Sequence, residues 1–325
     1  MSGPASIGYF GKIPSRGDFI KGSDNPALLK ILDDWLAGAM DLLSADPRWK
    51  IMYDAVAPLH FAFIGPRRGR AIAGHITASS DQSSRRFPFL MMSTMAIDEP
   101  ARFVPNSPLA LGRLWHRLET LSVGIMHAAD PSAPLQELAT QAIDLDLRAA
   151  THDAAFAEFL DLQTVGALDA MLAQSGFVGS VRQILLALGL LLQPVMASAS
   201  SRLEKSLVLP LPADPMYRNL VAAFWMHLIA PFLARADFEL ALFLTRIRER
   251  HVLVIGFSGA SSQTLQAIMD PQAGLEHHIT FDDLSWVEEQ VNSDYSIKKV
   301  STYLAQANLS LTSAHDSVRE AFIGI

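Results

Sequence analysis

The chain has 325 residues, half of them hydrophobic, a net charge of −7 and no cysteine. The acidic balance argues against a general nucleic-acid-binding protein, which usually presents a basic face. The lack of cysteine excludes disulfides, thiol nucleophiles and zinc–thiolate sites. A chain of this length and composition can bury one large core or two smaller ones.

The N-terminal sequence and the length of the apolar runs indicate the cellular compartment of the protein. The opening MSGPASIG has no basic region before an apolar core, so we expect no signal peptide. The longest apolar run, Ile184–Leu192, is shorter than the about 20 residues that span a bilayer. We therefore predict a cytoplasmic protein without membrane insertion and without a nucleic-acid partner.

The first hundred residues combine a helix with three strands. Asn25-Pro26 joins a helix-capping residue to proline at the first helical position, which predicts a helix start. A hairpin is predicted at 59–64 and 70–77, with its turn at Gly65–Gly69, and a third strand at 87–96. The buried face of the helix is predicted from apolar residues at helical spacing: Leu28, Leu32, Trp35, Leu36, Ala39 and Leu43.

The middle of the chain is predicted to be helical, and strands return near its end. Ser107-Pro108 repeats the cap-and-proline start, and an apolar stripe follows it as far as Ile125. Strands are expected at Phe238–Thr245 and His251–Phe257, then a helix to Met269 and short amphipathic helices from Phe281. Further helices are predicted at Leu135–Ala149, Ala155–Leu162, Ser180–Gln193 and Asn219–Ala234.

These elements predict an α/β layered sandwich with a large helical insert. Its central sheet would be mixed, mainly antiparallel, and built from about five strands taken from both ends of the chain. The predicted parts are an N-terminal α/β half at 1–106, a helical insert at 107–235, returning strands and a helix at 236–280, and a helical C-terminal tail at 281–325. A separate helical domain at 130–235 is the alternative.

Two segments are rich in Gly, Pro, Ser, Arg and Asp and lie beside apolar runs: Gly8–Phe19, GYFGKIPSRGDF, and Ser79–Pro88, SSDQSSRRFP. We expect their charged residues to form one cluster, because guanidinium groups match carboxylates bidentately and hold loops in one geometry. A structural brace is the favoured interpretation and a direct partner contact the alternative. The expected members of the cluster are Arg16, Asp18, Asp81, Arg85 and Arg86.

The two segments resemble the TagF family, also called ImpM, of type VI secretion accessory proteins. The first segment fits along its whole length, and the second departs at Ser79 and Ser84, where the family usually has Pro and Gly. The family's Trp-Trp strand is represented only by Leu242-Phe243, and the chain is longer than a typical member. Between the two segments, five further residues fall where the family has its pattern of aromatic residues and proline: Trp35, Trp49, Tyr53, Pro58 and Phe61.

The resemblance implies a non-catalytic regulator that represses type VI secretion assembly after translation. Its implied partner is the forkhead-associated scaffold protein of the system, and a homodimer is possible; no cofactor is implied. A structural accessory subunit of the secretion machine is an alternative. The motif residues implied to shape the family surface or to bind are Gly11, Lys12, Pro14, Ser15, Arg16, Gly17, Asp18, Phe19, Ser80, Asp81, Arg85, Arg86, Phe87 and Pro88.

A serine hydrolase is the remaining alternative. Gly256–Ala260 follows a predicted strand and precedes a helix, as a nucleophile elbow does, and Asp270 with His277 or His278 would complete a triad for Ser258. However, the second glycine falls one position too early for this motif. The favoured interpretation is a tight strand-to-helix turn in which Ser261 or Ser262 caps the helix.

Two further patterns concern ligand binding. Gly8–Lys12 is not a P-loop, because it has two residues between its glycines and Ile13 after the lysine. In the predicted hairpin His60 would lie opposite His75, close enough for the two imidazoles to share a metal or a proton. A third ligand is not evident, so two partly buried rings satisfied by the backbone are favoured and no metal is predicted.

Overall fold

The computed structural model describes residues 4–197, 203–234 and 236–324. In this part of the chain the main sheet has the order β11-β8-β10-β9-β4-β5-β6-β2-β3, and every neighbouring pair is antiparallel except β11 with β8. Its strands are β2 (Gly8–Gly11), β3 (Ile20–Gly22), β4 (Leu59–Ile64), β5 (Arg70–Thr77), β6 (Phe89–Ala96), β8 (Ser206–Pro210), β9 (Leu240–Ile247), β10 (Arg250–Gly256) and β11 (His278–Thr280).

The predicted α/β class and mainly antiparallel sheet are confirmed, but the expected number of strands was wrong. The described residues place nine strands in this sheet instead of about five. Four of these strands have only three to five residues, too few for a period-2 pattern to stand out. One of the four, β8, lies inside the segment expected to be a helical insert. A separate two-stranded sheet pairs β1 (Pro4–Ser6) with β7 (Ala142–Asp144).

Each face of the main sheet carries its own apolar core, because successive strand residues point to opposite faces. On one face Trp35 of α1 packs on Phe61 of β4 and Phe243 of β9, with ring centroids 5.6 and 6.2 Å apart. On the other face Ala62 and Leu242 belong to a larger core shared with the helices of residues 100–233 and of the C-terminal tail. A large apolar side chain buried in either core contributes about 1.5–3 kcal/mol.

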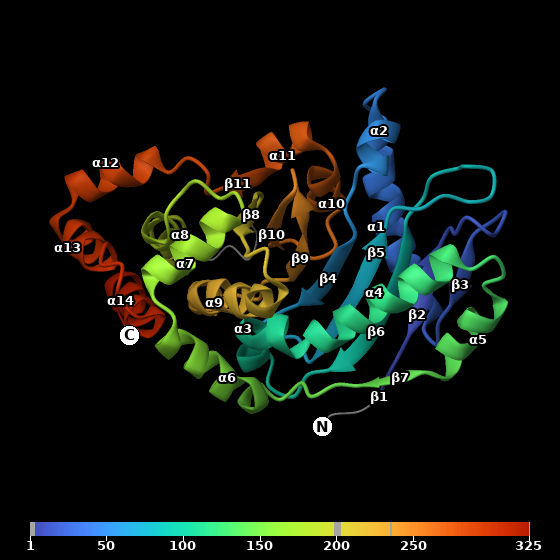
Figure 1. The fold of residues 1–325 in the computed structure, drawn as a ribbon, viewed down its shortest axis with the longest axis horizontal. Coiled ribbons are helices and arrows are strands. Elements are labelled where there is room, and N and C mark those ends of the chain that lie inside the picture. Colours follow the sequence, from blue (N-terminus) through green and yellow to red (C-terminus); the bar gives the residue numbers. More distant parts are fainter. Residues whose placement is uncertain (1–3, 198–202, 235, 325) are drawn as a thin grey trace.

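The helices form layers on both faces (Figure 1). The first core contains residues of α1, α2 and α10, whereas α3, α4, α8, α9 and α14 contribute to the second. The helices are α1 (Pro26–Ser44), α2 (Trp49–Asp54), α3 (Pro100–Ala110), α4 (Gly112–His127), α5 (Ser132–Thr140), α6 (Ala149–Leu162), α7 (Val165–Gln174), α8 (Val181–Ala197), α9 (Pro215–Leu233), α10 (Ser262–Met269), α11 (Pro271–His277), α12 (Ser285–Ser293), α13 (Tyr295–Leu304) and α14 (Leu311–Phe322).

Several helix boundaries differ from those predicted. Asn25 caps α1 as expected, its Oδ1 accepting a hydrogen bond from the Leu28 N–H at 3.1 Å. The helix expected from Ser107 to Ile125 is divided in two: its start lies in α3, which begins at Pro100 and contains Pro105 and Pro108, and the rest forms α4 from Gly112. The helix expected over 135–149 ends at Thr140, because the next residues form β7 and bond to β1. Helix α7 was not predicted.

The two edges of the main sheet lie at different parts of the molecule. Strands β2 and β3, with the N-terminal motif, form one edge near α5, whereas the helices α12, α13 and α14 gather at the opposite end (Figure 1). None of the described helices combines the length and the apolar character that crossing a membrane requires.

Candidate functional site

The sheet brings the two motif segments side by side. The first motif covers β2 and the loop to β3, and the second is the loop between β5 and β6. Strand β2 pairs antiparallel with β6, so that Gly11 lies opposite Phe89. Gly11 has a φ of 131°, and a Cβ there would lie 2.0 Å from the Pro88 carbonyl oxygen. Only glycine permits this close approach of the two backbones, so Gly11 is the point at which the two motif segments meet.

Asp81 is the centre of the contact between the two loops. The residue is only 2% exposed, and its carboxylate accepts four hydrogen bonds. One oxygen receives the Lys12 ammonium at 3.0 Å and the Arg85 Nε at 2.7 Å; the other receives the backbone N–H groups of Ser83 and Arg85, each at 2.9 Å. We call Lys12, Asp81 and Arg85 the motif base. In the motif base both oxygens of the buried Asp81 carboxylate have hydrogen-bond partners, which a buried charge needs in order to be stable.

The electrostatics of Asp81 follow from these contacts. Burial by itself would raise the pKa of this carboxyl group. Hydrogen bonds from the backbone of Arg85, from Lys12, from the Arg85 side chain and from the backbone of Ser83 outweigh burial and hold the pKa well below its usual range. Asp81 is therefore ionised throughout the neutral range and acts as an acceptor only.

Backbone contacts complete the brace. Arg85 Nη2 donates to the Gly17 carbonyl at 2.7 Å, and the Gln82 N–H donates to the Arg16 carbonyl at 2.9 Å. The Ser79 hydroxyl donates to the Lys12 carbonyl at 2.7 Å. Tyr53, which is buried, donates its hydroxyl to the Ser79 carbonyl at 3.0 Å and accepts from the Ser79 N–H at 2.8 Å. The loops are thus fixed to each other and to α2.

The expectation of one five-residue charged cluster was wrong. Only Asp81 and Arg85 pair as predicted, because the other three side chains leave the loops in different directions. Arg16 bonds to Asp130 at 3.3 Å and to the Ser132 hydroxyl at 2.6 Å. Arg86 pairs with Asp54 through two hydrogen bonds of 2.8 and 2.6 Å. Asp18 is exposed and accepts a bond from the Phe19 N–H at 2.8 Å.

The remaining motif residues divide between a buried support and an exposed rim. Phe10, Phe19 and Phe87 pack together, with centroids 4.9 to 5.8 Å apart, and the Lys12 ammonium lies 4.9 Å from the Phe19 ring. Pro88 is buried, Ser15 and Ser80 are half-buried and Pro14 is exposed. Phe19 remains 43% exposed. The exposed residues at the loop tips, which we call the motif ridge, are Gly17, Asp18, Phe19, Gln82, Ser83 and Ser84.

Ser84 explains one departure from the family pattern. Its φ is 62°, in the left-handed region that favours glycine. The glycine usual at this place in the family would adopt this conformation without the steric cost that serine carries. Sequence reasoning also assigned too little to Lys12, which was named as a motif residue but left out of the charged cluster. Its position next to Gly11, beside β6, is visible only once β2 and β6 are paired.

The turn after β10 matches the favoured interpretation. The Ser261 side chain caps α10, accepting a bond from the Thr264 N–H, and Gly259 has a φ of 59°. Ser258 is exposed, and its backbone forms a bridge with Glu239. His278 lines a cavity whose lining does not include Ser258. Whether Ser258 has any reactivity stays a prediction.

The predicted register of the hairpin is confirmed: His60 lies opposite His75. Their Nδ1 atoms are 3.1 Å apart, and Nε2 of His75 lies 3.1 Å from the Thr77 hydroxyl. Burial lowers the pKa of His60 to about 3, helped by the neighbouring imidazole, and that of His75 to about 4. Both rings are neutral at pH 7 and share one proton between the facing nitrogens. The described residues hold no group of three side chains that could bind a metal ion.

Comparison with known proteins bears on the motif half of the chain. Residues 8–142 match the family of the TagF N-terminal domain, described as type VI secretion system-associated. A crystal structure of PA0076 from Pseudomonas aeruginosa PAO1 aligns at 26% identity and a TM-score of 0.34, over 41% of this chain. The alignment spans 61% of that protein's chain, less than two thirds of its length. No curated protein is matched.

Proposed function

We propose that the protein is a non-catalytic regulator associated with type VI secretion, because residues 8–142 match the family of the TagF N-terminal domain. In this proposal it represses assembly of the secretion system after translation. It does so in the cytoplasm, by binding the forkhead-associated scaffold protein of the system. The domain match over both motifs is the observation that carries the proposal.

The geometry of the motifs supports two separate roles within this domain, a structural role for the motif base and partner binding for the motif ridge. The motif base is occupied with its own hydrogen bonds, with Lys12 and Asp81 buried and Arg85 partly exposed, so its residues act as a brace. The motif ridge presents Asp18 and the half-exposed Phe19 ring to the surface on a fixed backbone. A rigid loop with an aromatic anchor and an adjacent charge is well suited to partner binding, because little conformational entropy is lost on association. We therefore place the partner contact on the ridge.

The experiment is a pull-down from the native bacterium with tagged protein. The wild type is compared with a ridge variant, Asp18→Ala with Phe19→Ala. The matched control is Asp161→Ala with Leu162→Ala, another exposed acidic and apolar pair, at the end of α6. All forms are first checked by thermal melt.

The proposal expects the wild type and the control to recover a forkhead-associated protein, and the ridge variant to recover much less. Equal recovery by all three forms would support the repressor function but would show that the partner does not bind at the motif ridge. Stoichiometric recovery of the assembled secretion machine would favour a structural subunit. A wild type that recovers no forkhead-associated protein would overturn the proposal.

A further inference from the structure

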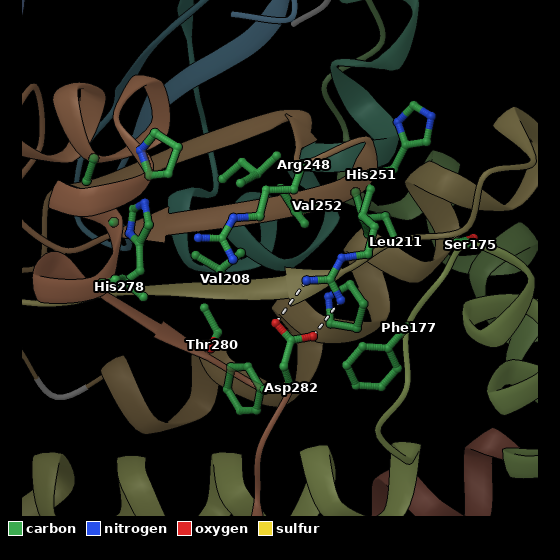
Figure 2. Close-up of a pocket in the computed structure, with 18 residues that line it drawn as sticks. Ser175, Phe177, Val208, Leu211, Arg248, His251, Val252, His278, Thr280 and Asp282 are labelled. Atoms are coloured by element: carbon green, nitrogen blue, oxygen red, sulfur yellow. Dashed lines mark hydrogen bonds and ion pairs between the residues drawn. The ribbon is translucent and has the colours of Figure 1, made fainter. Parts of the chain in front are cut away.

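A cavity of about 160 Å³ lies outside the motif half of the chain. It is formed where β8, β10 and β11 meet α11 and the segment that follows α7 (Figure 2). Its lining runs from Ser175 to Asp282, so none of it belongs to residues 8–142. Whatever this cavity does is therefore separate from the matched domain.

The cavity has an excess of positive charge. Arg250 is bound bidentately by Asp282, with hydrogen bonds of 2.5 and 2.9 Å, which offsets that guanidinium (Figure 2). Arg248 also lines the cavity, and within the described residues it makes no ion pair or hydrogen bond through its side chain. Arg248 and Glu249 have φ values of 49° and 65° and form the two-residue turn between β9 and β10. This turn fixes the start of the Arg248 side chain at the cavity mouth.

His278 supplies a second, independent sign of a binding site. The residue is only 8% exposed, and neither ring nitrogen makes a hydrogen bond with the rest of the described chain. Burial lowers the pKa of His278 to about 4; the backbone of Ala267 and of His277 opposes this shift, and the neighbouring His277 imidazole adds to it. The ring is thus neutral at pH 7, with one N–H donor and one acceptor. A buried polar group without a partner is costly, so a ligand that bonds to it gains affinity.

Most of the remaining wall is apolar, with Ser175, His251 and Thr280 as its polar members, and it limits the size of the ligand. It includes the rings of Phe177 and Phe281 and the side chains of Val208, Leu211 and Val252. An apolar cavity of about 150 Å³ accommodates benzene, so this one fits a body of that size. Arg248 lines the cavity and is exposed, so it lies where the cavity meets the solvent.

We propose that this cavity binds a small organic anion, a carboxylate or a phosphate monoester carried on an apolar body about the size of a benzene ring. The anionic head would be held by Arg248, whose planar guanidinium matches carboxylate and phosphate oxygens bidentately. His278 would donate its N–H to the same ligand, and the apolar wall would bury the body. Asp282 keeps Arg250 in place and repels an anion from the Arg250 side of the cavity.

The test is calorimetric titration of the full chain with benzoate, phenyl phosphate, inorganic phosphate and benzyl alcohol. Benzyl alcohol has the same body without the charge, and inorganic phosphate has the charge without the body. We expect at least one of the two aromatic anions to bind at least tenfold more tightly than either of these. The tighter of benzoate and phenyl phosphate identifies the carboxylate or the phosphate class. Binding of neither anion, or equal affinity for benzyl alcohol, would overturn the proposal.

Two pairs of variants assign the contacts. Arg248→Asn suits the left-handed turn and removes the charge; Arg246→Asn is its control, because Arg246 is near in sequence but absent from the cavity wall. His278→Gln is compared with His277→Gln in the same way. We expect Arg248→Asn and His278→Gln each to weaken binding about tenfold or more, a change of about 1.4 kcal/mol, and the controls to bind as the wild type. An unchanged affinity in Arg248→Asn would overturn the assignment even if the anion binds.

Discussion

The motif base and the cavity at His278 use similar residues in opposite ways. Each contains an ion pair between an arginine and an aspartate. Each also contains a further buried polar side chain, Lys12 at the motif base and His278 at the cavity. At the base, Asp81 is buried and accepts four hydrogen bonds, and Lys12 and Arg85 are both paired with it. At the cavity, Asp282 is 42% exposed and pairs with Arg250, while Arg248 and the buried ring of His278 have no partner in the described chain.

This difference separates a brace from a binding site. A polar group that is satisfied by its own chain stabilises one loop geometry and has no capacity left for a ligand. A polar group that is buried without a partner lowers stability and leaves that capacity open. The base should therefore respond to substitution with a loss of stability, and the cavity should respond with little loss or a gain. Three predictions test this contrast and a fourth tests the motif ridge, in order of decreasing effect on stability.

The largest effect is expected at Gly11, where the motifs join. In Gly11→Ala the new Cβ would meet the Pro88 carbonyl oxygen at 2.0 Å, and the φ of 131° strains any other residue. We expect the free energy of unfolding to fall by roughly 3–4 kcal/mol. Gly17→Ala is the control, because its Cβ would meet nothing closer than the Gln82 side chain at 3.9 Å. Denaturant titration should show Gly17→Ala within about 0.5 kcal/mol of the wild type. Equal losses in both would mean that the β2–β6 junction is not the fixed point of the brace.

Asp81→Asn should give the next largest effect, because it leaves the buried Lys12 ammonium without its carboxylate. We expect the melting temperature at pH 7 to fall by roughly 5–10 °C. Asp54→Asn, which breaks only the half-exposed pair with Arg86, should change it little.

The pH dependence of the same variant gives a second readout. The pKa of Asp81 is lower in the folded state than in the unfolded chain, so the stability it provides is present above about pH 4. That stability is lost as the pH falls towards the folded pKa. The melting curves of the wild type and Asp81→Asn should therefore converge on acidification. A constant difference down to low pH would show that the charge of Asp81 is not what holds the loops.

His278→Leu should change the stability in the opposite direction. It replaces a buried ring with two unpartnered nitrogens by an apolar side chain in a largely apolar wall, so we expect the melting temperature to stay the same or to rise. His75→Leu is the matched control, since it removes a ring that bonds to His60 and Thr77. That control should lose about 1–3 kcal/mol. If His278→Leu loses as much as His75→Leu, then the ring nitrogens of His278 have partners and the contrast between the two sites fails.

The sequence was most informative where short-range geometry decides the structure. The hairpin at 59–64 and 70–77, and with it the pairing of His60 with His75, follows from the position and length of one turn. The motif resemblance identified the domain now matched over residues 8–142. By contrast, β2, β3, β8 and β11 are too short to show a strand pattern and are fixed only by their neighbours in the sheet.

Long-range pairing was not predictable from the sequence. Charge composition suggested that the five motif charges pair with one another. Instead, Arg16 is bound by Asp130 in the loop between α4 and α5, and Arg86 by Asp54 at the end of α2. The cavity at His278 shows the same limit, because its wall combines residues from four separate parts of the chain between 175 and 282. No local pattern marks such a site. The roles predicted for the motif residues in binding stay predictions.

The smallest change in stability is expected in Asp18→Ala, and it tests the motif ridge. Asp18 is exposed and accepts a hydrogen bond only from the adjacent Phe19 N–H within the described structure, so the free energy of unfolding should change by no more than about 0.5 kcal/mol. If the ridge binds the partner, recovery of the forkhead-associated protein should fall while the melting curve stays unchanged. A loss of several degrees would instead place Asp18 in the brace. The ridge would then have no charged group free to bind a partner, and the contact would have to lie elsewhere on the domain.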